Sequence, residues 1–334
     1  MKALVVSLLV SVLLAVGLVG AAVWYMLVVP GRSFAGPLPQ STAEERDLAR
    51  RLQQHVVAVA SVPHNAMYPE ALEKAARYTE TTLAALGYQV ARQEFTESLR
   101  GRTVRNVEAA IEPVSSGPQS ATLVVGAHYD SAGAAPGAND NGTGTAAVLE
   151  LARLLADLRP AHTRVRFVLF VNEEPPYSRG PDMGSVRYAA ALRARGENVA
   201  GMISLETLGA FSDAPGSQHY PSPFQYLYPS TANFIAFVGL PGSRTFLHSV
   251  LASFRRHTRF PTIGGIVPDI VPGAGWSDHW AFAEHGYPGV MITDTALFRY
   301  EHYHRPTDTP DKVDYDKLAR ITKGVERVLR ELVR

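Results

Sequence analysis

Cysteine is absent from this chain of 334 residues. Its absence excludes thiol catalysis, disulfide bonds and zinc held by thiolates, so any bound metal ion must have nitrogen and oxygen ligands. Long basic runs are also absent, since nothing longer than a pair such as Arg255-Arg256 occurs. With a formal net charge of +1, we do not expect nucleic-acid binding to be the main function.

The first 31 residues have a composition of their own. No charged residue lies between Ala3 and Val29, and a helix of this length, about 40 Å, exceeds the roughly 20 residues that cross a bilayer. Trp24 and Tyr25 lie where an interfacial aromatic belt is expected. We expect residues 1–31 to be a membrane anchor that leaves the rest of the chain extracytoplasmic. A long cleaved signal peptide, which would make the protein secreted, is the alternative.

The remaining chain has the composition of a globular protein, with 46% hydrophobic and 19% charged residues overall. Residues 32–41, rich in Pro, Gly and Ser, are expected to be a linker. No internal repeat interrupts residues 42–334, so we expect them to form one domain.

Strand-like and helix-like patterns alternate from residue 121 onward. Such alternation implies crossover connections and a mostly parallel sheet covered on both faces, a three-layer α/β/α sandwich. A predicted hairpin and two predicted helices precede this region. The expected strands are 88–95, 104–111, 121–126, 164–171, 200–205 and 234–239, with an apolar run at 289–293; the expected helices are 42–59, 69–86, 144–156, 185–195, 243–257 and 316–332.

Metal-ligating residue types follow several of these apolar runs. The carboxyl ends of parallel strands meet at one edge of a sheet, where open α/β sheets bind their ligands. Carboxylates and imidazoles gathered there form the layout of a metal site, with nitrogen and oxygen ligands that suit zinc. The residues concerned are His128, Asp140, Glu174, Glu206 and His304.

The motifs around these positions carry a family resemblance. They are His128-Tyr129-Asp130, Asn139-Asp140-Asn141-Gly142, Asn172-Glu173-Glu174, Gly184-Ser185, Ser277-Asp278-His279 and Tyr303-His304. In this order and spacing the sequence resembles peptidase family M28, co-catalytic zinc peptidases, over about residues 60–330. The resemblance implies a zinc-exopeptidase-like fold, two zinc ions, and removal of the N-terminal residue from a peptide substrate.

The same resemblance implies a role for each ligand. His128 and Glu206 would hold one metal ion, Glu174 and His304 would hold the other, and Asp140 would bridge them. Many family members have aspartate at the position of Glu206, and the extra methylene of glutamate affects the geometry of that metal site. If that site were lost, a single-zinc glutaminyl cyclase would be the alternative function. A non-catalytic ectodomain that kept the peptidase fold is a third possibility, although no ligand is missing.

Three further residues receive catalytic roles. By the resemblance, Glu173 would be the general base that activates a metal-bridged water, and Asp130 would orient a metal-binding histidine. Tyr303 is either a donor to the developing oxyanion or a packed core tyrosine. Asp278 is a weaker candidate for orienting a histidine, and Asp308 is expected to fix the turn after residue 304.

The irregular segment 210–230 contains five aromatic residues among Pro, Ser and Gly. It is interpreted either as a packed surface loop or as a wall or lid of the substrate pocket.

Overall fold

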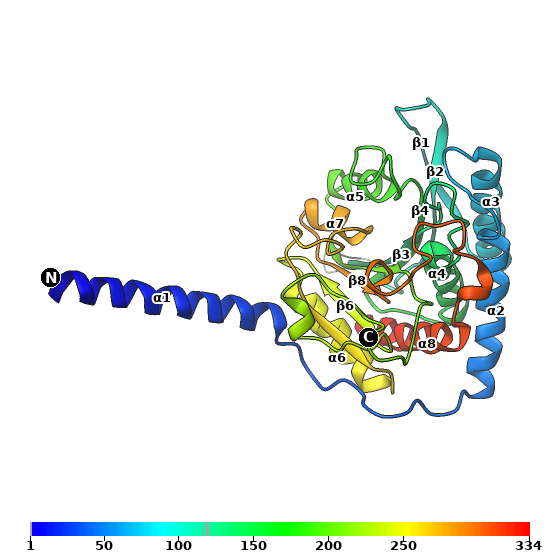
Figure 1. Ribbon diagram of the computed structural model, residues 1–334. Helices are drawn as coiled ribbons and strands as arrows, with labels where there is room; N and C mark the ends of the chain where they lie inside the picture. The colour runs from blue at the N-terminus through cyan, green and yellow to red at the C-terminus, as the bar shows by residue number, and fades with distance from the viewer. Residues whose placement is uncertain (1, 116, 118–119) are drawn as a thin grey trace.

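The computed structural model describes residues 2–115, 117 and 120–334. One long helix, α1, extends away from an α/β domain that contains all other elements (Figure 1). The elements are α1 (Lys2–Leu27), α2 (Ala43–Val59), α3 (Pro69–Ala85), β1 (Ala91–Thr96), β2 (Thr103–Ile111), β3 (Ala121–His128), α4 (Thr143–Leu154), β4 (Thr163–Phe170), α5 (Gly184–Ala194), β5 (Val199–Glu206), β6 (Ile235–Gly239), α6 (Arg244–His257), β7 (Thr262–Ile266), α7 (His279–Glu284), β8 (Gly289–Thr293) and α8 (Tyr315–Leu332).

The strands form a single mixed sheet in the order β1-β2-β4-β3-β5-β8-β6-β7. Its centre, β4-β3-β5-β8, is parallel, while β1 and β2 pair antiparallel and β6 runs antiparallel to β8. The predicted mixed, mostly parallel α/β architecture is therefore confirmed.

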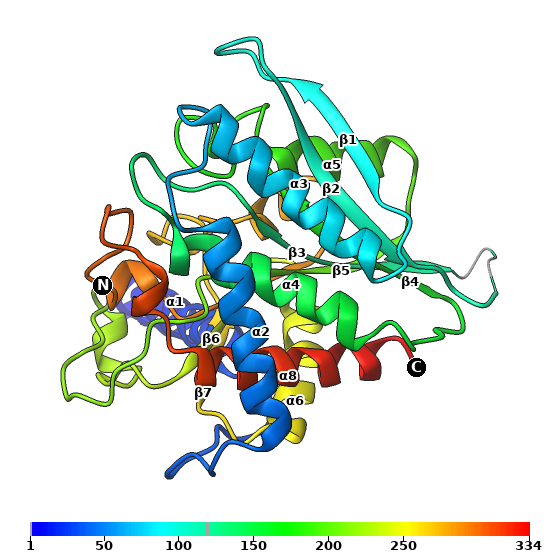
Figure 2. The same ribbon diagram turned by 90° about the vertical axis from the view of Figure 1, so that its right-hand side faces the viewer.

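Helices cover both faces of the sheet, which gives three layers. One hydrophobic cluster joins one face to residues of α2, α3, α4, α6 and α8. A smaller cluster joins the other face to α5 and α7 and includes Phe170, Tyr188 and Phe282. In Figure 2, α2, α4 and α8 lie in front of the strands and α5 lies behind them.

The helices begin where the local sequence satisfies their free backbone groups. At α2 the hydroxyl of Thr42 accepts from the backbone N–H of Glu45 at 3.1 Å, while the Glu45 carboxylate accepts from the Thr42 N–H at 2.7 Å. This capping box fixes the first turn. The apolar positions that predicted the helix are buried against the domain: Leu48, Leu52, Val56 and Val59.

Two elements were not predicted from the sequence. Strand β7, Thr-Ile-Gly-Gly-Ile, contains two glycines and has no alternating pattern, so its sequence is typical of a loop. Helix α7 has only six residues and is too short to show a helical period.

Helix α1 includes a segment, Leu9–Leu27, that is long and apolar enough to cross a membrane, and none of this segment is buried. Residues 30–33, after it, are attached to the domain by side chains. Arg255 donates to the carbonyl oxygen of Pro30 at 2.7 Å, and the backbone N–H of Thr262 donates to the hydroxyl of Ser33 at 2.8 Å. The first residues of the expected linker are therefore held against the edge strand β7.

Gly144, in the first turn of α4, allows the helix to approach the end of β5. A Cβ atom there would lie 2.3 Å from both the Leu205 carbonyl oxygen and Oδ1 of Asn141. These two groups are themselves joined, because the Asn141 amide donates to the Leu205 carbonyl at 2.8 Å. The end of β5 and the turn at Ala138–Gly142 are therefore held together by a contact that only glycine permits.

We predict that Gly144→Ala lowers the free energy of unfolding by about 1–3 kcal/mol, because backbone atoms must move to admit the methyl group. Urea unfolding of the detergent-solubilised chain measures this change. Gly20→Ala is the matched control, because nothing lies within 4 Å of a Cβ atom at Gly20. Equal stability of the two variants would show that the approach of α4 to β5 is not tight.

Candidate metal centre

The carboxyl ends of β3, β4 and β5 lie next to one another at one edge of the sheet. His128 is the last residue of β3, Glu206 is the last residue of β5, and the two strands pair in parallel. Strand β4 ends at Phe170, so Glu173 and Glu174 follow in a loop beside the same edge. The predicted convergence of strand ends is therefore present.

Loops bring the remaining expected ligands to this edge. Asp140 lies in the turn between β3 and α4, and His304 lies between β8 and α8. Nε2 of His128 lies 3.4 Å from Oδ1 of Asp140 and 3.3 Å from Oε2 of Glu206. Nε2 of His304 lies 3.0 Å from Oδ2 of Asp140 and 3.3 Å from Oε2 of Glu174. All five residues expected as ligands thus come together, with Asp140 between the two histidines.

Three of these four separations, at 3.3–3.4 Å, are longer than a normal hydrogen bond and match the spacing of ligands around a metal ion. Ligand atoms 2.0–2.1 Å from a tetrahedral zinc ion lie about 3.3 Å from one another. Oδ2 of Asp140 and Oε1 of Glu174 are buried and lack a hydrogen bond, although Nε2 of His304 approaches Oδ2 of Asp140. Because buried polar atoms are normally satisfied, these oxygens are free to hold a cation. Atoms of His128, Asp140 and Glu174 all lie within 4.8 Å of one another.

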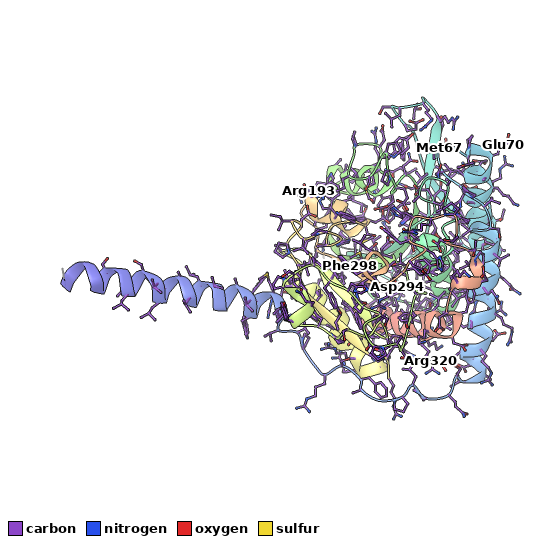
Figure 3. All side chains as sticks on the ribbon, viewed as in Figure 1. Met67, Glu70, Arg193, Asp294, Phe298 and Arg320 are labelled. Atoms are coloured by element: carbon purple, nitrogen blue, oxygen red, sulfur yellow. The ribbon has the colours of Figure 1, made fainter. Side chains whose placement is uncertain are left out.

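The turn that carries Asp140 is held by carboxylates that the sequence did not assign to the site. The Asp308 carboxylate accepts from the backbone N–H of Asn139 at 2.9 Å and of Asp140 at 3.1 Å. The Asp294 carboxylate accepts from the Asn139 amide at 3.0 Å and from the backbone N–H of Ala210 at 2.7 Å. Asp294 lies inside the domain (Figure 3). Asp308 therefore does more than fix its own turn, because it positions the central ligand.

Asp130 orients both a histidine and the two glutamates. Its backbone carbonyl accepts from Nδ1 of His128 at 3.0 Å, so the histidine presents Nε2 to the site. Its carboxylate accepts from the backbone N–H groups of Glu173 at 3.1 Å and Glu174 at 3.3 Å. The contact with His128 that was expected from the Asp130 side chain is made chiefly by its backbone.

The backbone before Glu173 adopts an unusual conformation. Asn172 has φ of 61°, and His304 has φ of 57°, values that non-glycine residues adopt rarely and that concentrate at functional sites. The turn at Asn172 directs both glutamates inward, so that Oε2 of Glu173 lies 3.9 Å from Nε2 of His128. No feature of the sequence pattern identified these two backbone conformations.

Ser277 is a further site residue without an assigned role in the sequence. Its hydroxyl donates to Oε2 of Glu206 at 2.8 Å and contacts the hydroxyl of Ser204 at 2.8 Å. The longer side chain of Glu206 is therefore held in place. Asp278, by contrast, is fully buried, and within the described part of the chain neither of its carboxylate oxygens has a hydrogen-bond partner, a histidine included.

The charges of the site depend on one another. Burial raises the pKa of Glu173 well above its ordinary value and that of Glu174 to about 7, with repulsion from Asp140 adding to the second. Burial also raises the pKa of Glu206 to about 7. Burial alone would lower the pKa of His304, but the nearby Asp140 and Glu174 carboxylates raise it to about 11. Without a metal ion, protons on these groups balance the buried negative charge.

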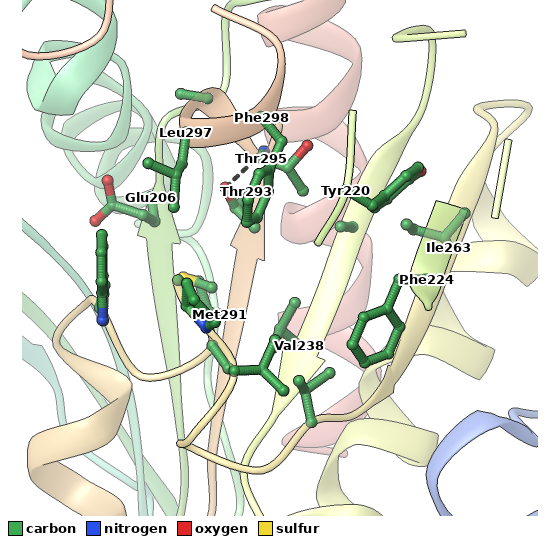
Figure 4. A pocket seen from close by; sticks show the side chains of 18 of the residues that line it. Glu206, Tyr220, Phe224, Val238, Ile263, Met291, Thr293, Thr295, Leu297 and Phe298 are labelled. Carbon is green, nitrogen blue, oxygen red and sulfur yellow. Dashed lines mark hydrogen bonds between the residues drawn. The ribbon is translucent and has the colours of Figure 1, made fainter. Parts of the chain in front are cut away.

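An apolar pocket opens beside Glu206. Its cavity of about 880 Å³, open to solvent, is lined by Tyr303 and by aromatic residues of the 210–230 segment, among them Tyr220 and Phe224. Figure 4 shows Glu206 at one side and Tyr220, Phe224 and Ile263 at the other, with Met291 and Val238 between them. The segment 210–230 therefore forms one wall of this pocket. The ring of Tyr303 stacks on His304 with centroids 3.9 Å apart.

Comparison with known proteins is consistent with this geometry. The model of the family "Peptidase family M28" matches residues 106–329. The chain belongs to this family.

The chain is also 37% identical over 276 residues to the uncharacterized protein YfbL of Escherichia coli (strain K12), a match that covers 80% of this chain and 82% of that protein. It is 28% identical over 224 residues to the probable aminopeptidase YDR415C of Saccharomyces cerevisiae, covering 63% of this chain and 53% of the yeast protein. The chain thus spans about half the length of this relative. As an M28 protein, it is a metallopeptidase.

Solved structures share the fold. The zinc aminopeptidase BSAP of Bacillus subtilis superposes with a TM-score of 0.66 at 17% identity, covering 90% of this chain and 96% of BSAP. The glutaminyl cyclase of Fimbriiglobus ruber superposes with a TM-score of 0.58 at 20% identity, covering 92% and 99%. At these identities the likeness concerns the fold alone.

We predict that metal affinity rises with pH. At pH 6 the carboxyl groups of Glu174 and Glu206, whose pKa values are about 7, are largely protonated, and at pH 8 they are largely ionised. His304, with a pKa of about 11, is protonated at both values. Since a metal ion must displace these protons, affinity should fall at least about tenfold from pH 8 to pH 6.

Calorimetric titration with zinc in two buffers of different ionisation enthalpy measures both the affinity and the protons released. An affinity that is equal at the two pH values, with no proton release, would contradict this linkage.

Proposed function

We propose that the protein is a di-zinc aminopeptidase. The observation that carries this proposal is the position of Asp140, whose two carboxylate oxygens lie 3.4 Å and 3.0 Å from Nε2 of His128 and His304 respectively. A carboxylate placed in this way has one oxygen for each of two metal ions. His128 and Glu206 would complete the first ligand set, and Glu174 and His304 the second.

The charge of the ligand set supports two divalent ions. Asp140, Glu174 and Glu206 supply three negative charges, and a bridging hydroxide would supply a fourth against the +4 of two zinc ions. When bound, the ions would lower the pKa of a shared water toward neutrality and polarise the scissile carbonyl group. The names of zinc-dependent relatives and structural neighbours agree with zinc as the metal.

Glu173 is the residue placed to move the proton. It is buried, it is outside the two ligand sets, and its backbone is fixed by Asp130. Its pKa is raised by burial first and then by the neighbouring Glu174, so it can accept a proton from the nucleophilic water and return it to the leaving amine. Tyr303, which stacks on His304 and lines the pocket, would donate to the developing oxyanion.

The pocket specifies the first residue of the substrate. Because its wall is aromatic and aliphatic, it favours a large apolar side chain. Glu206 lines one side of the pocket, so a substrate α-ammonium group would face the Glu206 and Glu173 carboxylates while its first carbonyl group faces the ligand edge. Relatives named leucine aminopeptidase agree with this preference.

Glutaminyl cyclase activity is the second candidate, because cyclases share the fold. A single zinc ion would suffice for that reaction, whereas this chain places both histidines and a carboxylate between them. Two metal ions per chain would favour the peptidase. The complete ligand set and the fixed Glu173 likewise disfavour a non-catalytic ectodomain.

We also propose that α1 anchors the protein in a membrane with the catalytic domain on the extracytoplasmic side. The unburied segment Leu9–Leu27 has the length and hydropathy of a membrane span. A long cleaved signal peptide is the alternative.

We predict that Glu173→Gln lowers kcat by about 10²–10⁴-fold or more and leaves metal content at two ions per chain, because Glu173 transfers protons rather than binding metal. Glu174→Gln is the matched control and should lose metal. Activity assays on Leu-Gly-Gly with metal analysis of the purified variants measure both effects. Loss of metal from Glu173→Gln, or near-full activity, would show that the two glutamates have other roles.

We predict that cleavage requires a free α-amine. N-acetylation removes the charge that the buried carboxylates bind, and a charge-assisted contact of this kind contributes about 1.5–3 kcal/mol. Leu-Gly-Gly should therefore lose its first residue at least about tenfold faster than N-acetyl-Leu-Gly-Gly, as measured by kcat/KM. Equal values for the two peptides, or release of the C-terminal glycine first, would overturn the aminopeptidase proposal.

A further inference from the structure

Exposed apolar side chains adjoin, along the chain, residues that line the pocket. Tyr226 and Leu227 are 81% and 53% exposed and lie beside the lining residues Phe224 and Tyr228; Ile270 is 90% exposed and lies beside the lining residue Val271. We call Tyr226, Leu227 and Ile270 the apolar rim. None of the three lines the pocket itself, so the proposed binding of a substrate side chain does not explain their exposure.

The segments that carry the rim have very little charge. From Ala214 to Ser243 the sequence contains no Asp, Glu, Lys or Arg. From Phe260 to Trp276 the only such residue is Asp269, and it forms an ion pair with Arg179. A water-exposed surface normally carries charged side chains, whereas a surface with exposed aromatic and aliphatic groups and few charges is typical of an interaction site.

The end of α1 is fixed to the same part of the domain. A Cβ atom at Gly265, a pocket-lining residue of β7, would lie 2.8 Å from the carbonyl oxygen of Met26 and 3.2 Å from the Tyr228 hydroxyl. The guanidinium group of Arg244 lies over the rings of Trp24 and Tyr25, at 4.9 and 5.1 Å, and Nε donates to the Tyr25 carbonyl at 3.1 Å.

These contacts leave no flexible spacer between the proposed membrane span and β7. Trp24 and Tyr25 have the amphipathic rings that lie at the headgroup level of a bilayer, and arginine at that level can contact lipid phosphates. The edge of the domain at β7 must then lie at the same depth. In Figure 1, α1 leaves the domain on the side of α6 and β6, and α2 covers the opposite side.

We propose that the apolar rim inserts into the outer surface of the bilayer, so that the mouth of the pocket opens at the membrane. The occupant of this surface is lipid, because the rim continues from the point where the membrane helix joins the domain. Aromatic and aliphatic side chains of such a surface enter the boundary between headgroups and acyl chains.

This arrangement names a substrate class, a step that rests on the proposed aminopeptidase function. The enzyme takes peptides whose free N-terminus and apolar first residue lie in the interfacial layer of the membrane, such as peptides tethered to lipid or released into the bilayer. Soluble peptides remain substrates, because the pocket itself is unchanged by the contact with lipid.

The natural absence of cysteine allows a direct test with the full-length chain. Single-cysteine variants Tyr226→Cys and Ile270→Cys are labelled with an environment-sensitive fluorophore and reconstituted into phosphatidylcholine–phosphatidylglycerol vesicles that contain doxyl-labelled lipid. Leu13→Cys, in the exposed surface of α1, is the control for membrane insertion; Val57→Cys, 45% exposed on α2, is the control for the opposite side of the domain.

The proposal expects lipid quenching at positions 226, 270 and 13 and none at position 57. Quenching at 13 alone would overturn it, as would quenching at 57 equal to that at 270. Absence of quenching at 13 would also overturn it, because α1 would then not hold the domain at a bilayer. Cross-linking of two chains through position 270 without quenching would show that a second copy covers the rim.

A comparison of cleavage rates on two peptides tests the substrate class. The full-length double variant Tyr226→Asp/Ile270→Asp should cleave soluble Leu-Gly-Gly as the unmodified chain does but should cleave a lipid-tethered Leu peptide about tenfold more slowly, a loss of about 1.4 kcal/mol. Equal loss on both substrates, or on neither, would contradict the substrate class. If the unmodified chain cleaves neither peptide, the proposed aminopeptidase function is wrong. The quenching experiment still tests separately whether the apolar rim inserts into the bilayer.

Discussion

The structure depends on the burial of four carboxylates at one edge of a sheet. Asp140, Glu173, Glu174 and Glu206 are each less than 8% exposed, and within the described residues their ion-pair partners are the two histidines. Burying like charges together is strongly unfavourable unless protons or cations balance them. The surrounding polypeptide must hold them against this repulsion. It does so with backbone N–H groups directed at further carboxylates and with the tightly packed turn before α4.

That requirement explains why the site extends beyond its ligands. Asp308, Asp294 and Asp130 are not among the expected metal ligands, yet each accepts backbone hydrogen bonds from a segment that carries a ligand or the proposed base. Such supporting groups fix ligand orientation, and their loss typically weakens metal binding. A carboxylate that binds two backbone N–H groups also opposes the rotation that would let the buried ligands separate. The repulsion among the ligands is therefore resisted by the fold before any metal binds.

The sequence predicted the parts that depend on periodicity and strand ends. Alternation of apolar runs identified the sheet centre, and the positions after those runs identified His128, Asp140, Glu174, Glu206 and His304, which the structure brings together. The sequence did not predict β7, because its two glycines are atypical of a strand. It also did not predict the left-handed backbone conformations of Asn172 and His304. For Asp308, the sequence predicted only a local role in the turn after residue 304. These features depend on contacts between residues far apart in the chain, such as Asn139 with Asp308, and no local pattern records them.

Strand β7 also shows why the anchor and the pocket cannot be treated as separate modules. Its two glycines have different neighbours: a Cβ atom at Gly264 would meet the core residue Leu251 at 2.7 Å, and one at Gly265 would meet the end of α1. Both glycines line the pocket. A side chain at Gly265 would therefore push α1 away from the domain and narrow the pocket at the same time. The small size of this residue thus couples the position of α1 on the domain to the space inside the pocket.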